Sequence, residues 1–368
     1  MRRARHAFLF FAMFLAWFVV FEAGLRRWGC SEAAPAFQGL FTGDAQAGYR
    51  LKPGARTRFT TSEFDTDIAI NHAGVRDDEE IGPKSPGETR IAVLGDSLVL
   101  SVQVPFATTF TEQMEDKLNA NLPAGNGREY RVINAGVQGY GPVEELLFFR
   151  QVVKALDPDL VLVTVFVGND AEEAVSAQAK LSDDRPIEEV IRESIVTRLR
   201  RLVRRSMVLQ VLRLRILAAT ERFRTPAGPP EPPLQSYAAH PAPRIAQGIA
   251  FTREALAALA RDAESVGART GIILMPARFQ IDDPDYGRLR DIVAQAGGEL
   301  VRDAATERFR SALGDLGLPM IDLLPVLREA PPGPDLFFQE NVHLTPRGHA
   351  LVGETLAQFV KDRFSARY

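Results

Sequence analysis

The sequence predicts a three-layer α/β/α sandwich built around a parallel β-sheet. Five short apolar segments recur along the chain: "ETRIAVLGDS", "YRVINAG", "PDLVLVTVFVGND", "TGIILMPAR" and "LPMIDLLP". Continuous runs rich in β-branched residues are typical of strands that are covered on both faces, as in parallel sheets. Segments with helical features lie between these runs, and the alternation predicts helices on both faces of the sheet.

The helices are predicted from their start signals and their patterns. Thr109 and Glu112 form a capping box at the start of one helix, and Pro142 opens another at a position where proline is tolerated. Alternating residues over 64–70 predict a strand or hairpin that packs on the core ahead of the sheet. The predicted helices span about 109–119, 142–156, 251–266, 288–296 and 346–364.

The composition is that of a globular protein and excludes several functional classes. The 368 residues suffice for one large domain or two smaller ones, and 46% of them are hydrophobic. A net charge of −3 gives no overall field that attracts nucleic acid. The single cysteine, Cys30, excludes a disulfide framework. No cofactor is expected, because "LGDSLVLS" lacks the glycine spacing of a dinucleotide-binding loop, and no residue cluster resembles a metal site.

The first 29 residues are predicted to form a signal anchor, a transmembrane helix that tethers the protein. A basic start precedes an unbroken apolar run over 7–21, which reaches the length of a bilayer span of about 20 residues only if Glu22 is included. Trp17 and Trp28 suit a membrane interface. A cleaved signal peptide and a lipoprotein anchor at Cys30 are the alternatives.

The rest of the chain is predicted to contain two parts. Residues 30–88 form a linker and an N-terminal β segment that packs on the core, and residues 89–368 form the α/β domain. An insertion at about 175–248 separates the third and fourth strands of that domain. Its arginine-rich first half predicts a helix packed by its apolar face, and its proline-rich second half predicts extended backbone. A membrane-surface or lid role for the insertion is the alternative.

Polar residues follow the first three predicted strands, at the edge where sheets of this kind bind ligands. Ser97 follows the first strand on a strand-to-helix turn, which aims it as a nucleophile and offers its own N–H to an oxyanion. Gly139 and Asn169 follow the next two strands and offer a backbone N–H and a side-chain amide. His343, in a loop before the last helix, is the candidate base, whereas His349 is predicted to have a structural or capping role.

Four blocks of the chain, "VLGDS", "VINAGVQG", "VFVGND" and "ENVHLTPRGH", resemble the GDSL or SGNH hydrolase family over about 89–178 and 250–365. The resemblance implies the SGNH hydrolase fold with a flavodoxin-like, five-stranded parallel sheet. It implies Ser97 as the nucleophile and His343 as the base, with an oxyanion hole formed by Ser97, Gly139 and Asn169. The segments "YRLKPG" and "INHAGVR" look like a membrane-anchored bacterial subgroup, some relatives of which transfer or remove acetyl groups on exported polysaccharides.

Two departures from the family pattern bear on activity. The family usually carries aspartate two or three positions before the catalytic histidine, where this chain has Asn341 and Glu340. Glu340 is the candidate acid of the triad, because it keeps the charge that orients the imidazole and stabilises its cation. Asn341, Asp335 and a Ser–His pair without an acid are the alternatives. Ser101 and Gln103 stand where relatives commonly have glycines, which indicates a reshaped pocket wall or drift toward inactivity.

The sequence therefore predicts a membrane-anchored serine esterase that acts on acyl esters, acetyl esters among them, through Ser97, His343 and Glu340. The expected location is the periplasm or the cell exterior, with an acyl ester or acetylated glycan as partner and no nucleic acid. Two alternatives share the fold: an O-acyltransferase that acts on an exported polysaccharide, and a catalytically degenerate glycan-binding protein. Arg278 and Gln280 either line the cleft or belong to the surface.

Overall fold

The computed structural model describes residues 17–18, 39–44, 46–120, 122, 129–181, 233–333 and 335–364. The chain divides into two units, and the unit over 36–184 and 231–368 contains the α/β domain. The expected anchor over 1–29 and most of the expected insertion at 175–248 lie outside the described residues and stay predictions. Within the described ranges, no helix combines the length and apolar character needed to cross a bilayer.

A five-stranded parallel sheet forms the centre of this unit, and two short antiparallel hairpins precede it in the chain. The strand order is β6-β5-β7-β8-β9, and every neighbouring pair is parallel. This is the flavodoxin-like order that the resemblance implied. The strands are β1 (Phe41–Asp44), β2 (Gly48–Leu51), β3 (Arg56–Thr60), β4 (Asp65–Ala69), β5 (Glu88–Gly95), β6 (Glu129–Gly136), β7 (Leu160–Phe166), β8 (Arg269–Met275) and β9 (Met320–Asp322).

Helices connect the strands of the sheet. The predictions over 109–119 and 346–364 correspond to α4 and α14, whereas α10 begins ahead of the predicted 251 and α12 was not predicted. The helices are α3 (Ser97–Leu100), α4 (Phe110–Asn119), α5 (Pro142–Gln151), α6 (Asp170–Leu181), α10 (Pro243–Glu264), α11 (Asp283–Gln295), α12 (Ala304–Gly314), α13 (Leu324–Arg328) and α14 (Pro346–Phe364). Short 3-10 turns are η1 (Phe106–Thr108), η2 (Val153–Leu156), η3 (Gln235–Tyr237) and η4 (Arg278–Gln280).

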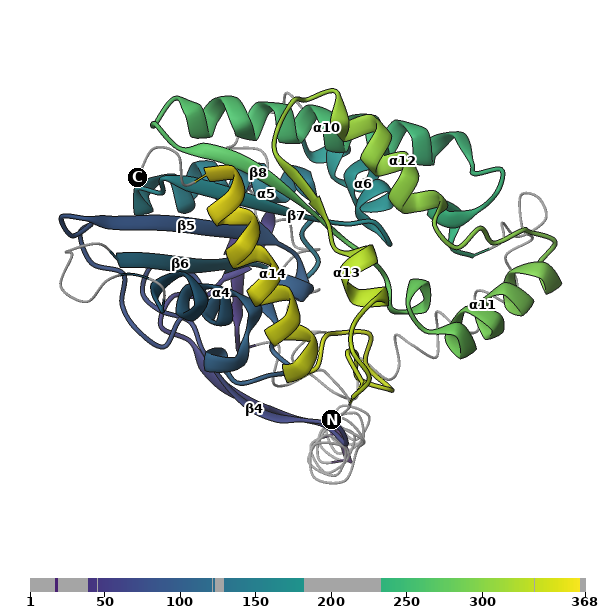
Figure 1. Cartoon of the computed structure of the whole chain (residues 1–368), viewed down its shortest axis with the longest axis horizontal. Helices are drawn as coiled ribbons and strands as arrows, with labels where there is room; N and C mark the ends of the chain where they lie inside the picture. The colour runs from purple at the N-terminus through teal and green to yellow at the C-terminus, as the bar shows by residue number, and fades with distance from the viewer. Residues whose placement is uncertain are drawn as a thin grey trace, which may run out of the picture. The chain divides into compact units, whose positions relative to one another are not determined.

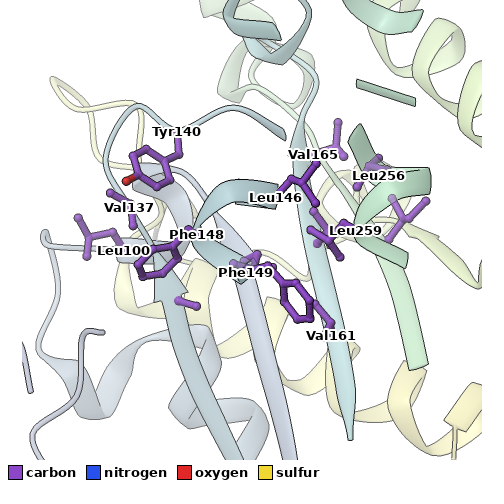
Figure 2. Packing of buried hydrophobic residues seen from close by; sticks show 14 of the residues in the cluster. Leu100, Val137, Tyr140, Leu146, Phe148, Phe149, Val161, Val165, Leu256 and Leu259 are labelled. Carbon is purple, nitrogen blue, oxygen red and sulfur yellow. The ribbon is translucent and has the colours of Figure 1, made fainter. Parts of the chain in front are cut away.

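The sheet is buried on both faces, as its continuous apolar strands require. Alternate residues of β5 divide between two hydrophobic clusters: Ala92 and Leu94 join one, and Ile91 and Val93 join the other. The first cluster includes side chains of α5, β7 and α10, which Figure 2 shows in contact. The second includes side chains of α4 and α14, which run side by side in Figure 1. The structure thus has the predicted three layers.

Gly248 lets α10 approach α6 closely. It lies within α10, and a Cβ atom at this position would sit 1.8 Å from the backbone oxygen of Ala171 in α6. A backbone atom cannot swing aside as the end of a flexible side chain can. A larger residue here would therefore push the two helices apart.

We predict that Gly248→Ala lowers the free energy of unfolding by about 1–3 kcal/mol, the usual cost of overpacking. Gly287→Ala in α11 is the matched control, because no atom lies within 4 Å of its Cβ position. Alanine at that half-buried but uncrowded helical position should raise the free energy of unfolding by about 0.5–1 kcal/mol. Urea denaturation measures both values, and equal effects of the two substitutions would contradict the close approach of α6 and α10.

Candidate active site

The candidate nucleophile and base lie in contact at the carboxyl edge of the sheet. Ser97 begins α3 directly after β5, and His343 lies in the loop before α14. Ser97 Oγ is 2.8 Å from His343 Nε2, which is a hydrogen-bonding distance. Both residues keep some exposed surface, so a substrate can reach them. The structure thus brings together the serine and the histidine that the sequence singled out.

A tight strand-to-helix turn presents Ser97. Asp96 caps α3, because its carboxylate accepts a hydrogen bond from the N–H of Leu98 at 2.8 Å. The short helix lies directly on the end of β6, where a Cβ atom at Gly136 would sit 2.2 Å from the backbone nitrogen of Leu100. Glycine at that strand end is therefore required for the serine to stand where it does.

Arg76 holds the segment behind Ser97 from inside the protein. Its side chain is 1% exposed and donates to the carbonyl oxygens of Leu100 and Val104, each at 2.7 Å. Ser101 and Gln103 lie in this segment and are 1% and 4% exposed. Side chains with so little surface cannot touch a bound substrate. Ser101 and Gln103, which stand where relatives commonly have glycines, therefore lie in the segment that supports Ser97 and do not form the wall of the cleft.

Asn341, rather than an acid, holds the far side of the His343 ring. The Oδ1 of Asn341 is in hydrogen-bond contact with His343 Nδ1 and also accepts the backbone N–H of His343 at 3.3 Å. A backbone N–H can only donate, so the side-chain atom that faces it is the oxygen. The ring therefore carries its proton on Nδ1, which leaves Nε2 free to accept the hydroxyl proton of Ser97.

Glu340 does not take the place predicted for the triad acid. Its carboxylate is exposed and accepts a hydrogen bond from Ser62 Oγ at 2.7 Å. Asp335 likewise bonds elsewhere, to the side-chain amide of Gln339 at 2.6 Å. The reason is local geometry: an Asn or Asp oxygen reaches the N–H two residues on in a short turn, and position 341, not 340, stands at that spacing from His343.

Burial lowers the pKa of His343 to about 4, because the ring is largely enclosed and its nearest side-chain partner, Asn341, has no charge. The imidazole is therefore neutral at physiological pH, which is the form that can accept a proton. The same environment does little to stabilise the imidazolium once it forms, since a carboxylate partner is lacking at Nδ1.

Gly139 lies in the turn that follows β6, held by a tyrosine of the first hairpin. Its φ of +68° is a left-handed conformation that glycine adopts without strain. Tyr49 Oη donates to the carbonyl oxygen of Gln138 at 2.6 Å, and Tyr140 Oη donates back to the carbonyl oxygen of Tyr49. A Cβ atom at position 139 would sit 2.9 Å from Tyr49 Oη. The tyrosine pair thus fixes this turn and excludes side chains from it.

Asn169 is oriented by acidic neighbours. Its Nδ2 donates to Glu173 Oε1 at 2.9 Å, and the amide also forms a side-chain hydrogen bond with Asp96, the residue before Ser97. These contacts place the Asn169 amide beside the turn that carries Ser97. Of the residues predicted for the oxyanion hole, Ser97 and Asn169 are therefore joined through Asp96.

Behind these turns lies a carboxylate cluster in which Asp96, Glu145 and Asp170 are buried and Glu173 is half-buried. Burial, together with the neighbouring carboxylates, raises the pKa of Glu145 and of Asp170 well above the ordinary range. Burial raises the pKa of Asp96 to about 6, and burial with nearby Asp96 and Glu144 raises the pKa of Glu173 to about 8. Near neutral pH the cluster therefore holds protons, which limits negative charge beside Asn169.

Two other histidines, His349 and His72, contact neighbouring side chains away from Ser97. His349 is 1% exposed, its ring stacks on Phe110, and its Nδ1 accepts the N–H of Phe110 at 3.2 Å. This is the structural role predicted for it, since it ties the start of α14 to the start of α4. His72 is exposed and pairs with Glu80 at 2.6 Å. In the described part of the chain, no group of three or more His, Cys, Asp or Glu residues could hold a metal ion.

Three residues that shape the site were not predicted as site residues. Tyr49 and Arg76 stand in the segments "YRLKPG" and "INHAGVR", so the resemblance marked their neighbourhood but not their contacts. Glu63 lies in the turn between β3 and β4, and nothing in the local sequence distinguishes it from a solvated turn residue. Of the two residues considered for lining the cleft, Gln280 is buried against Tyr237, whereas Arg278 contacts the loop before His343.

We predict that Glu145→Gln stabilises the protein increasingly as pH rises from 5 to 8. Neither carboxylate oxygen of Glu145 has a hydrogen-bond partner among the described residues. Because its pKa is raised on folding, the folded protein keeps a proton that the unfolded chain releases above its value of 4.5, so the carboxyl costs stability as pH rises. Thermal denaturation of both proteins across this range measures the difference, and a difference that does not change with pH would contradict the raised pKa.

Solved structures to which the chain is similar are distant. The lipase/acylhydrolase from Enterococcus faecalis is 15% identical, with 75% of this chain and 96% of that chain covered and a TM-score of 0.39. A catalytic mutant of Axe2, an acetylxylan esterase from Geobacillus stearothermophilus, is 13% identical, with 74% and 94% covered and a TM-score of 0.38. TesA is 13% identical, with 74% and 99% covered and a TM-score of 0.41. Scores this low add nothing to the fold that the strand order defines.

No curated protein matches the chain. Residues 235–367 match the family model described as the SGNH hydrolase-like domain of the acetyltransferase AlgX. The matched range is about a third of the chain and contains Asn341 and His343, whereas Ser97 and Asn169 lie ahead of it. The match supports an ester-acting hydrolase or acyltransferase of the SGNH hydrolase-like type.

Proposed function

We propose that the protein is a serine esterase that cleaves acetyl or other short acyl esters at Ser97. The observation that carries this proposal is the 2.8 Å contact between Ser97 Oγ and His343 Nε2, with Asn341 holding the opposite ring nitrogen. A nucleophile, a neutral base and a group that fixes the tautomer of the base are the parts that acyl transfer to serine requires.

In the first step, His343 takes the hydroxyl proton as Ser97 Oγ attacks the ester carbonyl and a tetrahedral oxyanion forms. The intermediate collapses, the bond to the alcohol breaks, and the imidazolium returns its proton to the departing alcohol. In the second step, His343 takes a proton from water, which attacks the acyl group on Ser97. The acid then leaves, and Ser97 regains its proton.

The oxyanion is stabilised in this proposal by the N–H groups of Ser97 and Gly139 and by the side-chain amide of Asn169. Position 139 carries no side chain that could shield its own N–H from a substrate. In the free protein the Asn169 amide donates to Glu173 and to Asp96, and one of these hydrogen bonds would be exchanged for one to the oxyanion. Removal of one such donor typically costs about 10²–10³-fold in rate.

Asn341 makes the proposed site a Ser–His–Asn arrangement in place of the predicted Ser–His–Glu. The amide orients the ring and fixes its tautomer, but it supplies no charge to stabilise the imidazolium. We therefore expect His343 to act as a base but to be less effective than a histidine paired with a carboxylate. A catalytically degenerate binding protein would not need Ser97 and His343 to remain in hydrogen-bond contact, and that contact favours the enzyme.

An acetyltransferase is the second candidate, favoured by the match of residues 235–367 to a domain of an acetyltransferase. It would use the same residues, with an acceptor hydroxyl, such as that of a glycan, in place of water in the second step. In either case we place the site outside the cytoplasm, tethered through the segment over 1–29. Both parts of that placement follow from the sequence.

We predict that Ser97→Ala lowers the turnover of 4-nitrophenyl acetate by about 10³-fold or more, because the acyl acceptor is removed. The assay is run with and without an acetyl-accepting oligosaccharide. Faster nitrophenol release and an acetylated sugar in its presence would identify a transferase. Wild-type turnover in the Ser97→Ala variant would refute the role of Ser97.

We predict that Asn341→Asp raises the pH at which activity is lost on acidification. In the wild type this loss should occur near the pKa of His343, about 4, since the base must be neutral. A carboxylate at Nδ1 favours the imidazolium and typically shifts such a pKa by about 1–3 units. Glu340→Gln, which alters a carboxylate bonded to Ser62, should leave the profile unchanged. Profiles of kcat/KM against pH decide between the two positions.

A further inference from the structure

The loop that carries the candidate base is held by a carboxylate from a distant hairpin. Glu63, in the turn between β3 and β4, accepts hydrogen bonds from three consecutive backbone N–H groups. Its Oε1 accepts from Gln339 at 2.6 Å and from Glu340 at 3.0 Å, and its Oε2 accepts from Asn341 at 2.9 Å. Hydrogen bonds to an ionised acceptor are about twice as strong as neutral ones.

A guanidinium holds the carbonyl groups of the same loop. Arg278 Nη1 donates to the carbonyl oxygen of Phe338 at 2.8 Å and to that of Gln339 at 2.6 Å. Asp285 anchors the guanidinium through Arg278 Nη2 at 3.0 Å. The backbone over 338–341 is therefore held from two sides. Glu63 accepts hydrogen bonds from its N–H groups, and Arg278 donates hydrogen bonds to its C=O groups.

The segment held by Glu63 ends at Asn341, the residue that orients His343. Asn341 receives the last of the three Glu63 hydrogen bonds on its backbone, and its side-chain oxygen contacts His343 Nδ1. Phe64, next to Glu63, packs on Phe338 with ring centroids 5.4 Å apart, so apolar packing backs the polar contacts. Displacement of the backbone at 341 would move the Asn341 oxygen away from the ring.

We propose that Glu63 is a positioning residue of the active site, which acts through the backbone of 339–341 to set Asn341 against His343. Arg278 complements it from the other side of the loop. Glu63 touches neither substrate nor reacting atoms, so its effect falls on the reaction rate through the geometry of the base. The catalytic part of this inference rests on the proposed esterase function, whereas the geometric part does not.

The experiment compares Glu63→Ala and Glu63→Gln with Asp65→Asn in the full-length protein. Asp65 lies on the same hairpin, but its carboxylate bonds to Arg58 and Thr60 and not to the loop. Glutamine keeps one oxygen that can accept hydrogen bonds from the loop, but its NH₂ group faces a backbone donor. We therefore expect Glu63→Gln to retain part of the hydrogen bonding to the loop. Kinetics use 4-nitrophenyl acetate, with active sites counted by a fluorophosphonate end point to correct for misfolded protein.

We expect kcat to fall about 10–100-fold in Glu63→Ala with KM nearly unchanged, because small misplacement of a catalytic group can cost about 10²-fold. Glu63→Gln should fall between Glu63→Ala and the wild type, and Asp65→Asn should match the wild type. A kcat for Glu63→Ala within twofold of the wild type, per active site, would overturn the proposal. An equal loss in Asp65→Asn would also overturn it, since that result would reflect the hairpin as a whole.

A second measurement separates this proposal from the esterase assignment. The Nδ1 proton of His343, held by Asn341, should give a downfield ¹H NMR signal that is assigned by its loss in His343→Gln. The signal should persist in Asp65→Asn and be lost or broadened by exchange in Glu63→Ala. This readout needs no turnover. If the wild type were inactive, the esterase function would be refuted, and the NMR signal would still test the positioning role of Glu63. An unchanged signal in Glu63→Ala would overturn the positioning role.

Discussion

The hydrogen bond between Ser97 Oγ and His343 Nε2 is the interaction on which the site depends, because it joins the first strand of the sheet to the loop before the last helix. Parallel strands bring the turns that carry Ser97, Gly139 and Asn169 to one edge, since all of them follow carboxyl ends. The sheet does not place His343 in this way, because the loop that carries His343 does not directly follow a strand. The loop must be held in position by contacts of its own.

The N-terminal β segment supplies supporting contacts to three of these four loops. Tyr49 bonds to the turn that contains Gly139, Arg76 bonds to the segment behind Ser97, and Glu63 bonds to the loop before His343. Each contact joins a side chain to backbone groups, which fixes loop geometry without placing another side chain among the reacting atoms. This segment is therefore part of the site's construction, and its contact with the last loop helps to explain how His343 is held 2.8 Å from Ser97.

The sequence predicted the parts of the fold that follow from local patterns. It did not predict the residues of the site whose role depends on contacts between distant parts of the chain. Continuous apolar runs predict the five strands, and the glycines beside them predict the turn that carries Ser97. Both signals come from residues that are neighbours in the sequence. The choice between Glu340 and Asn341 depends on which side chain faces the ring, and the preference for a charged acid misled the prediction. Glu63 could not be found, because its three partners lie far along the chain and are backbone groups that any residues would offer.

The proposed function requires Ser97 to be an activated nucleophile in a site completed by His343 and Asn341. Mass spectrometry of the protein after treatment with a fluorophosphonate tests it most directly, because the reagent forms a stable bond only with a serine whose proton is taken by a base. We expect one adduct, located on the peptide that contains Ser97 and absent in His343→Ala. A protein that remains unlabelled, or an adduct that forms equally well without His343, would contradict the claim.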